Sequence, residues 1–378
     1  MDIQKFLEKT RKLGIGFYTG VPDSQLRVLC DQLMTQYGIG SHHLIAANEG
    51  ACVGLAAGYY MATGRPALVY MQNSGIGNAV NPICSLAHEK VYAIPLLLVI
   101  GWRGEPGVKD EPQHVFQGEA TLDMLKCMGI EYFIIGRETM DEEIDEAFEE
   151  FSKVLEQKKH AAFVIRKDAF SGGHKLKYEN GNSMTRERIV NVIIDNTRPS
   201  DIVVSTTGKL SRELFEAREA RNEGHKRDFL TVGSMGHSCM IALGIAMEKQ
   251  SRRVFCLDGD GAVLMHMGGL AVIGARKPSN LIHIMINNEA HETVGGMPTV
   301  SGNVDYPSVA RACGYYFART VQSEDELIDT LHLVNSLQGP VFIEVKANLV
   351  SRADLGRPTT TPQQNKEDFI GFLKEDEN

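Results

Sequence analysis

The chain has 378 residues, and its 39 basic and 48 acidic side chains give a formal charge of −9 at pH 7. This length predicts two or three domains, and the 43% hydrophobic and 23% charged residues are ordinary globular values that exclude a disordered or fibrous chain. The negative charge argues against a nucleic-acid-binding protein, because such a protein needs a basic face. An anionic ligand would need a local cluster of lysine and arginine.

We expect neither a secretory signal nor a membrane span. Residues 1–10 are amphipathic and charged, without an apolar segment or a small-residue cleavage site. The longest apolar stretch, Val91–Trp102, is too short to cross a bilayer and contains Pro95 and Gly101. The seven cysteines are scattered without a C-x-x-C pair, which favours reduced thiols over disulfides or the common iron–sulfur sites. These features predict a cytoplasmic protein with no membrane partner.

In the first half of the chain, short β-branched runs alternate with longer segments of helical composition. Such alternation predicts a parallel sheet with helices on both faces. The predicted strands are Ile15–Thr19, His43–Ala46, Ala67–Met71, Ile94–Ile100, Tyr132–Ile135 and Ala161–Ile165. The predicted helices are Ser24–Tyr37, Glu49–Thr63 and Met140–Gln157.

A polar segment rich in glycine and asparagine, Ser171–Ser183, predicts a linker, after which the same rhythm restarts. The strands predicted beyond it are Ile202–Ser205, Phe229–Val232, Val254–Leu257, Leu281–Ile286, Tyr315–Ala318 and Val341–Val345. Helices are predicted at Met184–Asn196, Leu210–Asn222, His237–Lys249 and Glu324–Leu337. We therefore expect an α/β protein with two doubly wound parallel-sheet domains, residues 1–175 and 176–378. Ligands should bind beyond the carboxyl ends of the strands.

The most informative motif is Asp258-Gly259-Asp260-Gly261-Ala262, which follows a predicted strand. The next strand ends in Asn287-Asn288, and one helix, predicted at Val263–Ala275, joins the two. Carboxylate, amide and carbonyl oxygens are ligands that Mg²⁺ prefers, and they leave positions for phosphate oxygens. Glycine lets backbone N–H groups approach those phosphates. Alone, the glycine-rich segment indicates an ordinary turn, whereas the added asparagine pair favours a metal–phosphate site.

Gly259-Asp260-Gly261, followed about 25 residues later by Asn287-Asn288, resembles the diphosphate–metal motif of thiamine diphosphate (ThDP) enzymes. Two further motifs of that family are matched, Ala46-Ala47-Asn48-Glu49-Gly50-Ala51 and Val232-Gly233-Ser234-Met235-Gly236-His237. The resemblance covers essentially the whole chain. It implies the ThDP-binding fold, with a pyrimidine-binding domain at 1–175 and a diphosphate- and metal-binding domain at 176–378.

The resemblance also implies roles for single residues. Glu49 would be catalytic, bonding to N1′ of the aminopyrimidine and so making the 4′-amino group acidic enough to activate C2 of the thiazolium. Met235 would lie beneath the cofactor and hold it bent. The implied cofactor-binding residues are Glu49, Ser74, Thr207, Gly208, Gly233, Met235, Gly259, Gly261 and Ala262, and the implied Mg²⁺ ligands are Asp260, Asn288 and Ala290. Without the resemblance, Glu49 would be read as a helix N-terminal acid and Met235 as core filling.

The segment Gly101–His114 resembles the corresponding loop of the phosphonopyruvate decarboxylase family, with supporting matches at Gly20–Ser24, Gln72–Pro82 and Ser205–Lys209. Its cations suit a substrate with a carboxylate and a phosphonate, since the guanidinium fork donates two bonds. The alternative is a solvated loop, because acidic residues are interleaved. The candidate substrate-binding residues are Asp23, Ser24, Asn78, Arg103, Lys109, His114 and His291, the last of which could equally be structural.

The resemblance implies that the protein converts 3-phosphonopyruvate to phosphonoacetaldehyde and CO₂ through a C2 carbanion and an enamine, in phosphonate biosynthesis. It also implies at least a homodimer, with active sites at the subunit interface. Three alternatives remain. One is sulfopyruvate decarboxylase, and another is a different ThDP-dependent decarboxylase, carboligase or oxidoreductase. The third is a non-catalytic binding protein on the same fold, which should lack Glu49 or the Asp260/Asn288 pair.

Overall fold

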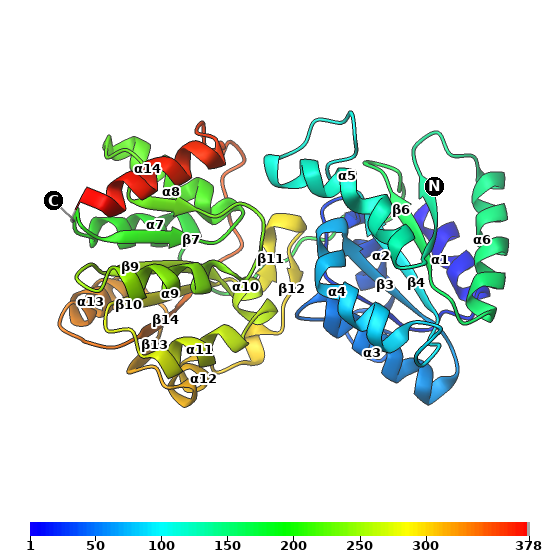
Figure 1. The fold of residues 1–378 in the computed structure, drawn as a ribbon, viewed down its shortest axis with the longest axis horizontal. Helices are drawn as coiled ribbons and strands as arrows, with labels where there is room; N and C mark the ends of the chain where they lie inside the picture. The colour runs from blue at the N-terminus through cyan, green and yellow to red at the C-terminus, as the bar shows by residue number, and fades with distance from the viewer. Residues whose placement is uncertain (376–378) are drawn as a thin grey trace. The chain divides into compact units, whose positions relative to one another are not determined.

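The computed structural model describes residues 1–375 and divides into two compact units, residues 1–177 and a second unit that begins at Tyr178 (Figure 1). The division falls inside the polar segment 171–183. Within residues 1–375, no helix is long and apolar enough to cross a membrane.

The first unit contains one six-stranded sheet in the order β2-β1-β3-β4-β6-β5, and all of its strand pairs are parallel. Its strands are β1 (Tyr18–Gly20), β2 (His43–Ile45), β3 (Ala67–Gln72), β4 (Leu96–Gly101), β5 (Glu131–Ile135) and β6 (Ala161–Ile165). Its helices are α1 (Ile3–Lys12), α2 (Arg27–Tyr37), α3 (Glu49–Thr63), α4 (Ile76–Pro82), α5 (Pro112–Cys127) and α6 (Asp141–Glu156), with a 3₁₀ turn η1 (Asn73–Gly75) and a π-turn η2 (Ile83–Ala87).

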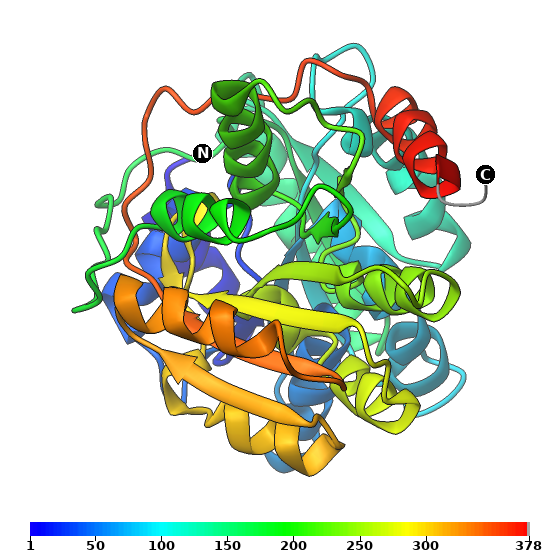
Figure 2. The same cartoon turned by 90° about the vertical axis from the view of Figure 1, so that its left-hand side faces the viewer.

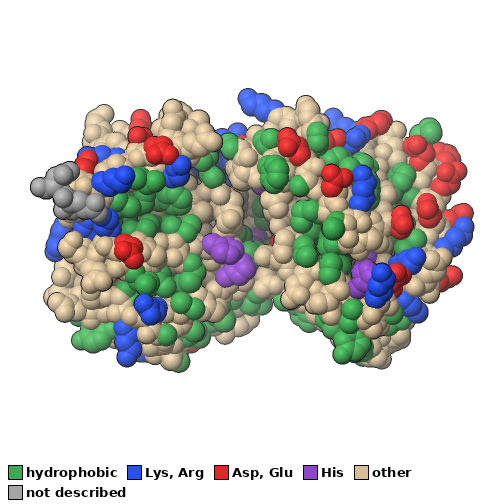
Figure 3. Space-filling view, in the orientation of Figure 1, with side chains coloured by type: hydrophobic (Ala, Val, Ile, Leu, Met, Phe, Trp, Pro, Cys, Tyr) green, Lys and Arg blue, Asp and Glu red, His purple; other side chains and the backbone are tan. Residues whose placement is uncertain are grey.

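Burial on both faces explains the apolar runs of the central strands. Every residue of β4 and of β6 is buried, as expected for a parallel sheet covered by helices on each side. Phe6 of α1 packs edge-to-face on Phe148 of α6 and Phe163 of β6, with ring centroids 5.5 and 5.3 Å apart. The outer face of α6 is polar, and Figure 3 shows acidic side chains gathered over it.

The second unit has a parallel six-stranded sheet in the order β13-β14-β10-β9-β7-β8 (Figure 2). Its strands are β7 (Ile202–Ser205), β8 (Asp228–Leu230), β9 (Val254–Gly259), β10 (Leu281–Asn287), β13 (Phe317–Val321) and β14 (Val341–Lys346), and a small hairpin is made by β11 (Ala290–His291) and β12 (Met297–Pro298). Its helices are α7 (Arg186–Asp195), α8 (Lys209–Arg221), α9 (Ser238–Glu248), α10 (Asp260–Met265), α11 (Gly268–Arg276), α12 (Tyr306–Cys313), α13 (Glu324–Val334) and α14 (Pro362–Lys374), with 3₁₀ turns η3 (Glu292–Val294) and η4 (Ser301–Asn303).

The two sheets share one strand order, because β8-β7-β9-β10-β14-β13 repeats β2-β1-β3-β4-β6-β5 when each unit's strands are counted along the chain. The predicted pair of doubly wound parallel sheets is therefore confirmed. In each unit the second strand pairs with one edge of the first strand, and the third strand pairs with its other edge. The switch point therefore lies between β1 and β3 in the first unit and between β7 and β9 in the second. Ligands of open α/β sheets bind at such switch points.

Several elements differ from the sequence prediction. Part of the segment expected as a loop forms α5, which begins with Pro112 in its first turn, a position that needs no N–H donor. The single helix predicted at Val263–Ala275 is wrong, since α10 and α11 are separated at His266–Met267, just before the helix-weakening pair Gly268-Gly269. The strand predicted at Tyr315–Ala318 instead begins at Phe317, and Tyr315 is a buried residue that precedes it.

Candidate active site

Glu49 lies at the first turn of α3, directly beyond the carboxyl end of β2. Asn48 caps the helix, and its side chain accepts a hydrogen bond of 2.8 Å from the Ala51 N–H. The Glu49 side chain is 5% exposed, and its Oε2 accepts a 2.7 Å hydrogen bond from Asn78 Nδ2. Burial raises the pKa of Glu49 above its usual value. A carboxyl group in this setting keeps its proton to a higher pH than an exposed glutamate does.

Glycine at position 75 gives this carboxyl its space. A Cβ atom at Gly75 would lie 2.5 Å from Oε1 of Glu49, so any larger residue would displace the carboxyl group. Gly75 belongs to η1, the 3₁₀ turn between β3 and α4. The structure therefore brings Glu49 and Asn78 together. The two sequence motifs that contain them did not reveal this contact.

A polar chain of side chains occupies the switch point of the first sheet, where β1 and β3 end. Gln72 Nε2 donates a 2.6 Å bond to Asp23 Oδ1, and Ser74 Oγ donates a 2.7 Å bond to Gln72 Oε1. Asp23 is fully buried, and burial raises its pKa. A side chain at Gly101 would clash with the Asp23 carboxyl group, so β4 ends in the one residue type that fits. Gln72 is a site residue that the sequence analysis named only within a longer match.

Arg103 follows β4 and is held from both its backbone and its side chain. Asn73 donates from Nδ2 to the Arg103 carbonyl at 2.8 Å and accepts the Arg103 N–H at 3.1 Å. The guanidinium donates from Nη1 to Ser24 Oγ at 3.2 Å and from Nε and Nη2 to Asp110, the Nε bond being 2.8 Å. Two of the predicted substrate residues, Ser24 and Arg103, are thus in contact.

The remaining candidates of this loop are less closely bound. His114 is half-buried, and its pKa is lowered by burial and by the positive charge of Arg103. Lys109 is exposed and makes no hydrogen bond or ion pair with any residue of 1–375. The loop closes where Gly104 meets Gly118 of α5, because a side chain at either position would clash with the backbone of the other segment.

The second unit places its candidates at the equivalent switch point, between β7 and β9. Thr207 follows β7, and its Oγ1 accepts a 3.0 Å bond from the Gly233 N–H. Gly208 and Gly233 have φ angles of 101° and 67°, which favour glycine. The Thr207 loop and the Val232–His237 loop are therefore joined within one unit.

Asp260 begins α10 and is 3% exposed. Its Oδ2 accepts a 2.6 Å bond from Thr299 Oγ1. Burial raises the pKa of Asp260 to about 6, against the opposing hydrogen bonds of Thr299 and Ser301. A cation at this carboxylate would remove the cost of holding a buried charge.

Asn288 lies next to Asp260 because of strand register. Gly259 pairs with Ile286, so the residues that follow β9 and β10 emerge beside each other. The Asn288 side chain accepts the Ala290 N–H at 3.2 Å, and the Thr299 N–H donates to the Glu289 carbonyl at 2.9 Å. The oxygen atoms of Asp260, Asn288 and Ala290 form a donor set that fits a hard divalent cation.

Met235 and His291 meet at Gly261. A Cβ atom at Gly261 would lie 3.1 Å from Cε of Met235 and 3.4 Å from Cε1 of His291. Burial lowers the pKa of His291 to about 4, so the imidazole is neutral at pH 7. Thr299 is a further residue of this cluster that the sequence analysis missed. It is brought there by the β11–β12 hairpin, and no motif in the sequence marks it.

Family models match segments in both units of the chain. Residues 4–133 match the family "Thiamine pyrophosphate enzyme, N-terminal TPP binding domain", and residues 206–345 match "Thiamine pyrophosphate enzyme, C-terminal TPP binding domain". A phosphonopyruvate decarboxylase of Streptomyces viridochromogenes is 33% identical, over 96% of this chain and 92% of that protein. One of Streptomyces hygroscopicus is 32% identical, over the same shares. A sulfopyruvate decarboxylase of Methanosarcina acetivorans is 26% identical, over 90% of each chain.

Proposed function

Since the chain belongs to the thiamine diphosphate-dependent decarboxylases, we propose that it converts 3-phosphonopyruvate to phosphonoacetaldehyde and CO₂, a step of phosphonate biosynthesis. The proposed substrate rests on the similarity to two phosphonopyruvate decarboxylases along 96% of the chain. The polar network at the end of the first sheet supports it, because Arg103 bonds to Ser24 and lies near Asp23 and His114.

We propose that Mg²⁺ binds at Asp260, Asn288 and the carbonyl oxygen of Ala290. These atoms are hard oxygen ligands, and the buried carboxylate gains most from a cation. Gly259 and Gly261, next to these ligands, carry no side chain that would keep a diphosphate away from the backbone. Further cofactor contacts are proposed at Ser74, Thr207, Gly208, Gly233 and Ala262.

Thiamine diphosphate supplies an electron sink that lets a 2-oxo acid lose its carboxylate as CO₂. Glu49 would hold a proton at the aminopyrimidine, which its buried position and raised pKa favour. Met235, whose Cε lies close to Gly261, would contact the bound cofactor and help to hold it. Asn78 keeps the Glu49 carboxyl group in one orientation through its 2.7 Å hydrogen bond.

The proposed substrate carries a carboxylate and a phosphonate, and its charge must be offset by the protein. Arg103, Lys109 and His114 provide cationic or donor groups on one loop, and Asp23, Ser24 and His291 are proposed to exchange protons with the substrate. Arg103 suits the phosphonate because its planar guanidinium donates two parallel bonds. His291 is neutral at pH 7, so that one ring nitrogen can donate a hydrogen bond and the other can accept one.

We propose that two copies of the chain are needed for one active site. The first unit contributes Glu49 and the second contributes Asp260, and in the proposed homodimer these groups come from different subunits. Each copy then completes the site of its partner, so the smallest active form is a homodimer.

The second candidate function is decarboxylation of sulfopyruvate, which has a sulfonate in place of the phosphonate. It is favoured by the 26% identity to a sulfopyruvate decarboxylase over 90% of the chain. Steady-state release of CO₂ from phosphonopyruvate, sulfopyruvate and pyruvate, with ThDP and Mg²⁺ present, separates the two. We expect the highest kcat/KM for phosphonopyruvate. A higher value for sulfopyruvate would overturn the substrate assignment and leave the decarboxylase intact.

A further inference from the structure

The carboxylate of Asp110 lies in a set of donors that would suit a bound anion. It accepts hydrogen bonds from Nε and Nη2 of Arg103, from the Gly104 N–H at 2.9 Å and from the Glu111 N–H at 2.8 Å. Burial by itself would raise the pKa of Asp110. The hydrogen bonds from Arg103 and from two backbone N–H groups outweigh burial and hold this pKa well below its usual value. The carboxylate is therefore ionised in the folded protein.

Most of these donors stay in place without Asp110. The Arg103 backbone is fixed by two hydrogen bonds to Asn73, and its Nη1 is held by Ser24. Gly104 is fixed by its close approach to Gly118. Only the Glu111 N–H belongs to the segment that would move with Asp110. The rigid part is a guanidinium fork with an adjacent backbone N–H, the donor pattern that recognises a phosphonate or sulfonate.

The segment that carries Asp110 can leave without disturbing the core. Residues 106–109 are exposed, and Gly104 and Gly107 have positive φ angles of 69° and 83°. Val108 is 49% exposed, so no buried contact holds the tip of the loop. Glu105 remains anchored by its 2.7 Å ion pair with Arg166 at the end of β6. The loop thus has one fixed side and one side held mainly by the Asp110 carboxylate.

We propose that Asp110 is an internal stand-in for the second anionic group of the substrate, a phosphonate or sulfonate, which displaces it from Arg103 and Gly104. This inference rests on the proposed function and adds to it a specificity-determining residue. A substrate without a second oxyanion cannot compete for these donors and leaves the carboxylate in place. Discrimination against simple 2-oxo acids follows, because the loop then remains closed on itself.

The inference predicts that removing the carboxylate exposes an anion site. We would measure binding of methylphosphonate and of methanesulfonate by calorimetry, using protein saturated with ThDP and Mg²⁺. Asp110→Ala should bind one of them about tenfold more tightly than the unchanged chain, because no internal anion competes for the charge-assisted bonds. The better-bound anion identifies the class of the second group. Asp110→Ala combined with Arg103→Met should lose the gain.

Asp123→Ala is the matched control, because it removes one negative charge from an exposed ion pair with Lys126 on α5 of the same unit. It should bind both anions as the unchanged chain does. If Asp110→Ala fails to fold, Asp110→Asn keeps the side-chain volume and should still show tighter binding. Binding by a folded Asp110 variant no tighter than by Asp123→Ala would overturn the inference.

Kinetics separate this inference from the proposed function. Asp110→Asn should lower KM for the substrate with the second anion and raise kcat/KM for pyruvate, because the loop no longer closes on Arg103 when that anion is absent. If phosphonopyruvate is a substrate but the variant gains no anion affinity, the inference is wrong and the proposed function stands. If the variant gains anion affinity but neither phosphonopyruvate nor sulfopyruvate is turned over, the proposed function is wrong and the anion site stands.

Discussion

At the scale of single residues, Glu49 combines burial with one hydrogen bond from Asn78, and both depend on neighbours that the fold brings in. Replacing it by glutamine keeps the shape and removes the acid. We expect Glu49→Gln to lower kcat by at least about 100-fold, the usual contribution of a positioned general acid–base group, while calorimetry shows ThDP and Mg²⁺ binding within a few-fold of normal.

The control for this variant is Glu142→Gln, which changes an exposed acid at the start of α6. It should have normal turnover. Near-normal activity of Glu49→Gln would remove Glu49 from the catalytic role, whatever the affinity for the cofactor.

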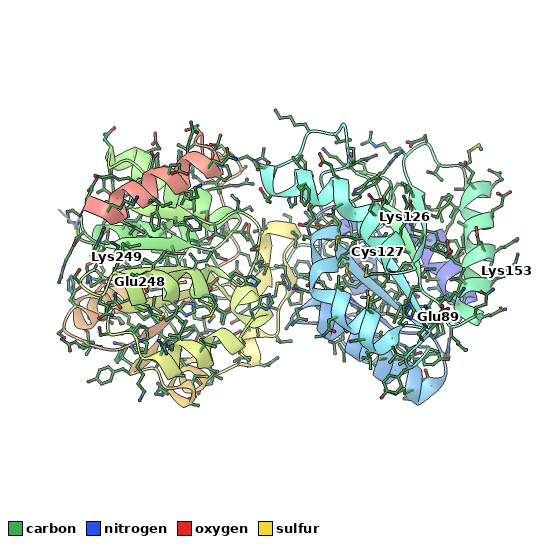
Figure 4. All side chains as sticks on the ribbon, viewed as in Figure 1. Glu89, Lys126, Cys127, Lys153, Glu248 and Lys249 are labelled. Carbon is green, nitrogen blue, oxygen red and sulfur yellow. The ribbon has the colours of Figure 1, made fainter. Side chains whose placement is uncertain are left out.

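His160 is a buried histidine whose titration opposes the folded state. It is 2% exposed, and neither ring nitrogen has a hydrogen-bond partner within residues 1–375. Burial and the nearby His88 lower its pKa to about 4. Glu89, labelled in Figure 4, follows His88 and pairs with Lys159 at 3.8 Å. Because the unfolded chain binds a proton more readily, the free energy of unfolding falls as the pH drops from 6.5 towards 4.

His160→Leu removes this titration. Between pH 7 and pH 5 the unchanged chain should lose about 2 kcal/mol of unfolding free energy through this residue, and the variant should lose correspondingly less. Trp102 is the one tryptophan and is buried in the first unit, so its fluorescence in urea reports unfolding of that unit. His42→Leu, at an exposed histidine, is the control. Equal pH dependence in all three proteins would contradict the assignment.

At the scale of elements, a buried ion pair joins α8 to β8. Arg218 and Asp228 are both fully buried, with Nε and Nη2 donating to the carboxylate at 2.8 and 2.9 Å. Asp228→Ala leaves the guanidinium short of a partner, and we expect it to lower the unfolding free energy by about 3–5 kcal/mol. Glu324→Ala, which breaks the exposed pair with Arg188, should lower the unfolding free energy far less, because water screens that pair. Urea unfolding followed by far-ultraviolet circular dichroism compares them, and equal losses would show that burial of the pair does not matter.

Sequence patterns predicted best those elements whose ends are marked by local chemistry. The helix Glu49–Thr63 was predicted with the bounds that the structure has, since Asn48 caps its start and Gly64 ends it in the left-handed region. By contrast, α5 was hidden in a polar, charged stretch with Gly118 at its middle. That glycine serves the contact with Gly104, which is a tertiary requirement that no local pattern reveals.

The candidate site was predictable to the same degree. Glu49, Asp260 and Asn288 stand in recognisable motifs directly after strands. The groups that tune them do not, because Thr299 reaches Asp260 through the β11–β12 hairpin and Asp110 reaches Arg103 through a loop closure. Such contacts depend on how segments fold back on one another. Periodicity and spacing report only what lies along the chain.

At the scale of the whole molecule, two units with one strand order carry complementary groups. The switch point of the first unit holds carboxyl and amide side chains near Glu49, and that of the second holds the oxygen donors around Asp260. In the proposed site, the first unit supplies the acid for the aminopyrimidine and the second supplies the ligands for the cation. The central claim is that these groups meet on one cofactor across a boundary between two copies of the chain.

Co-expression of two inactive variants tests this claim most directly. Glu49→Gln and Asp260→Asn should each be inactive as pure proteins. If the two residues come from different subunits, random assembly of the mixture leaves both intact in about one site in four, so the account predicts about a quarter of the normal CO₂ release. A mixed assembly, verified with two affinity tags, that is no more active than either variant alone would contradict it.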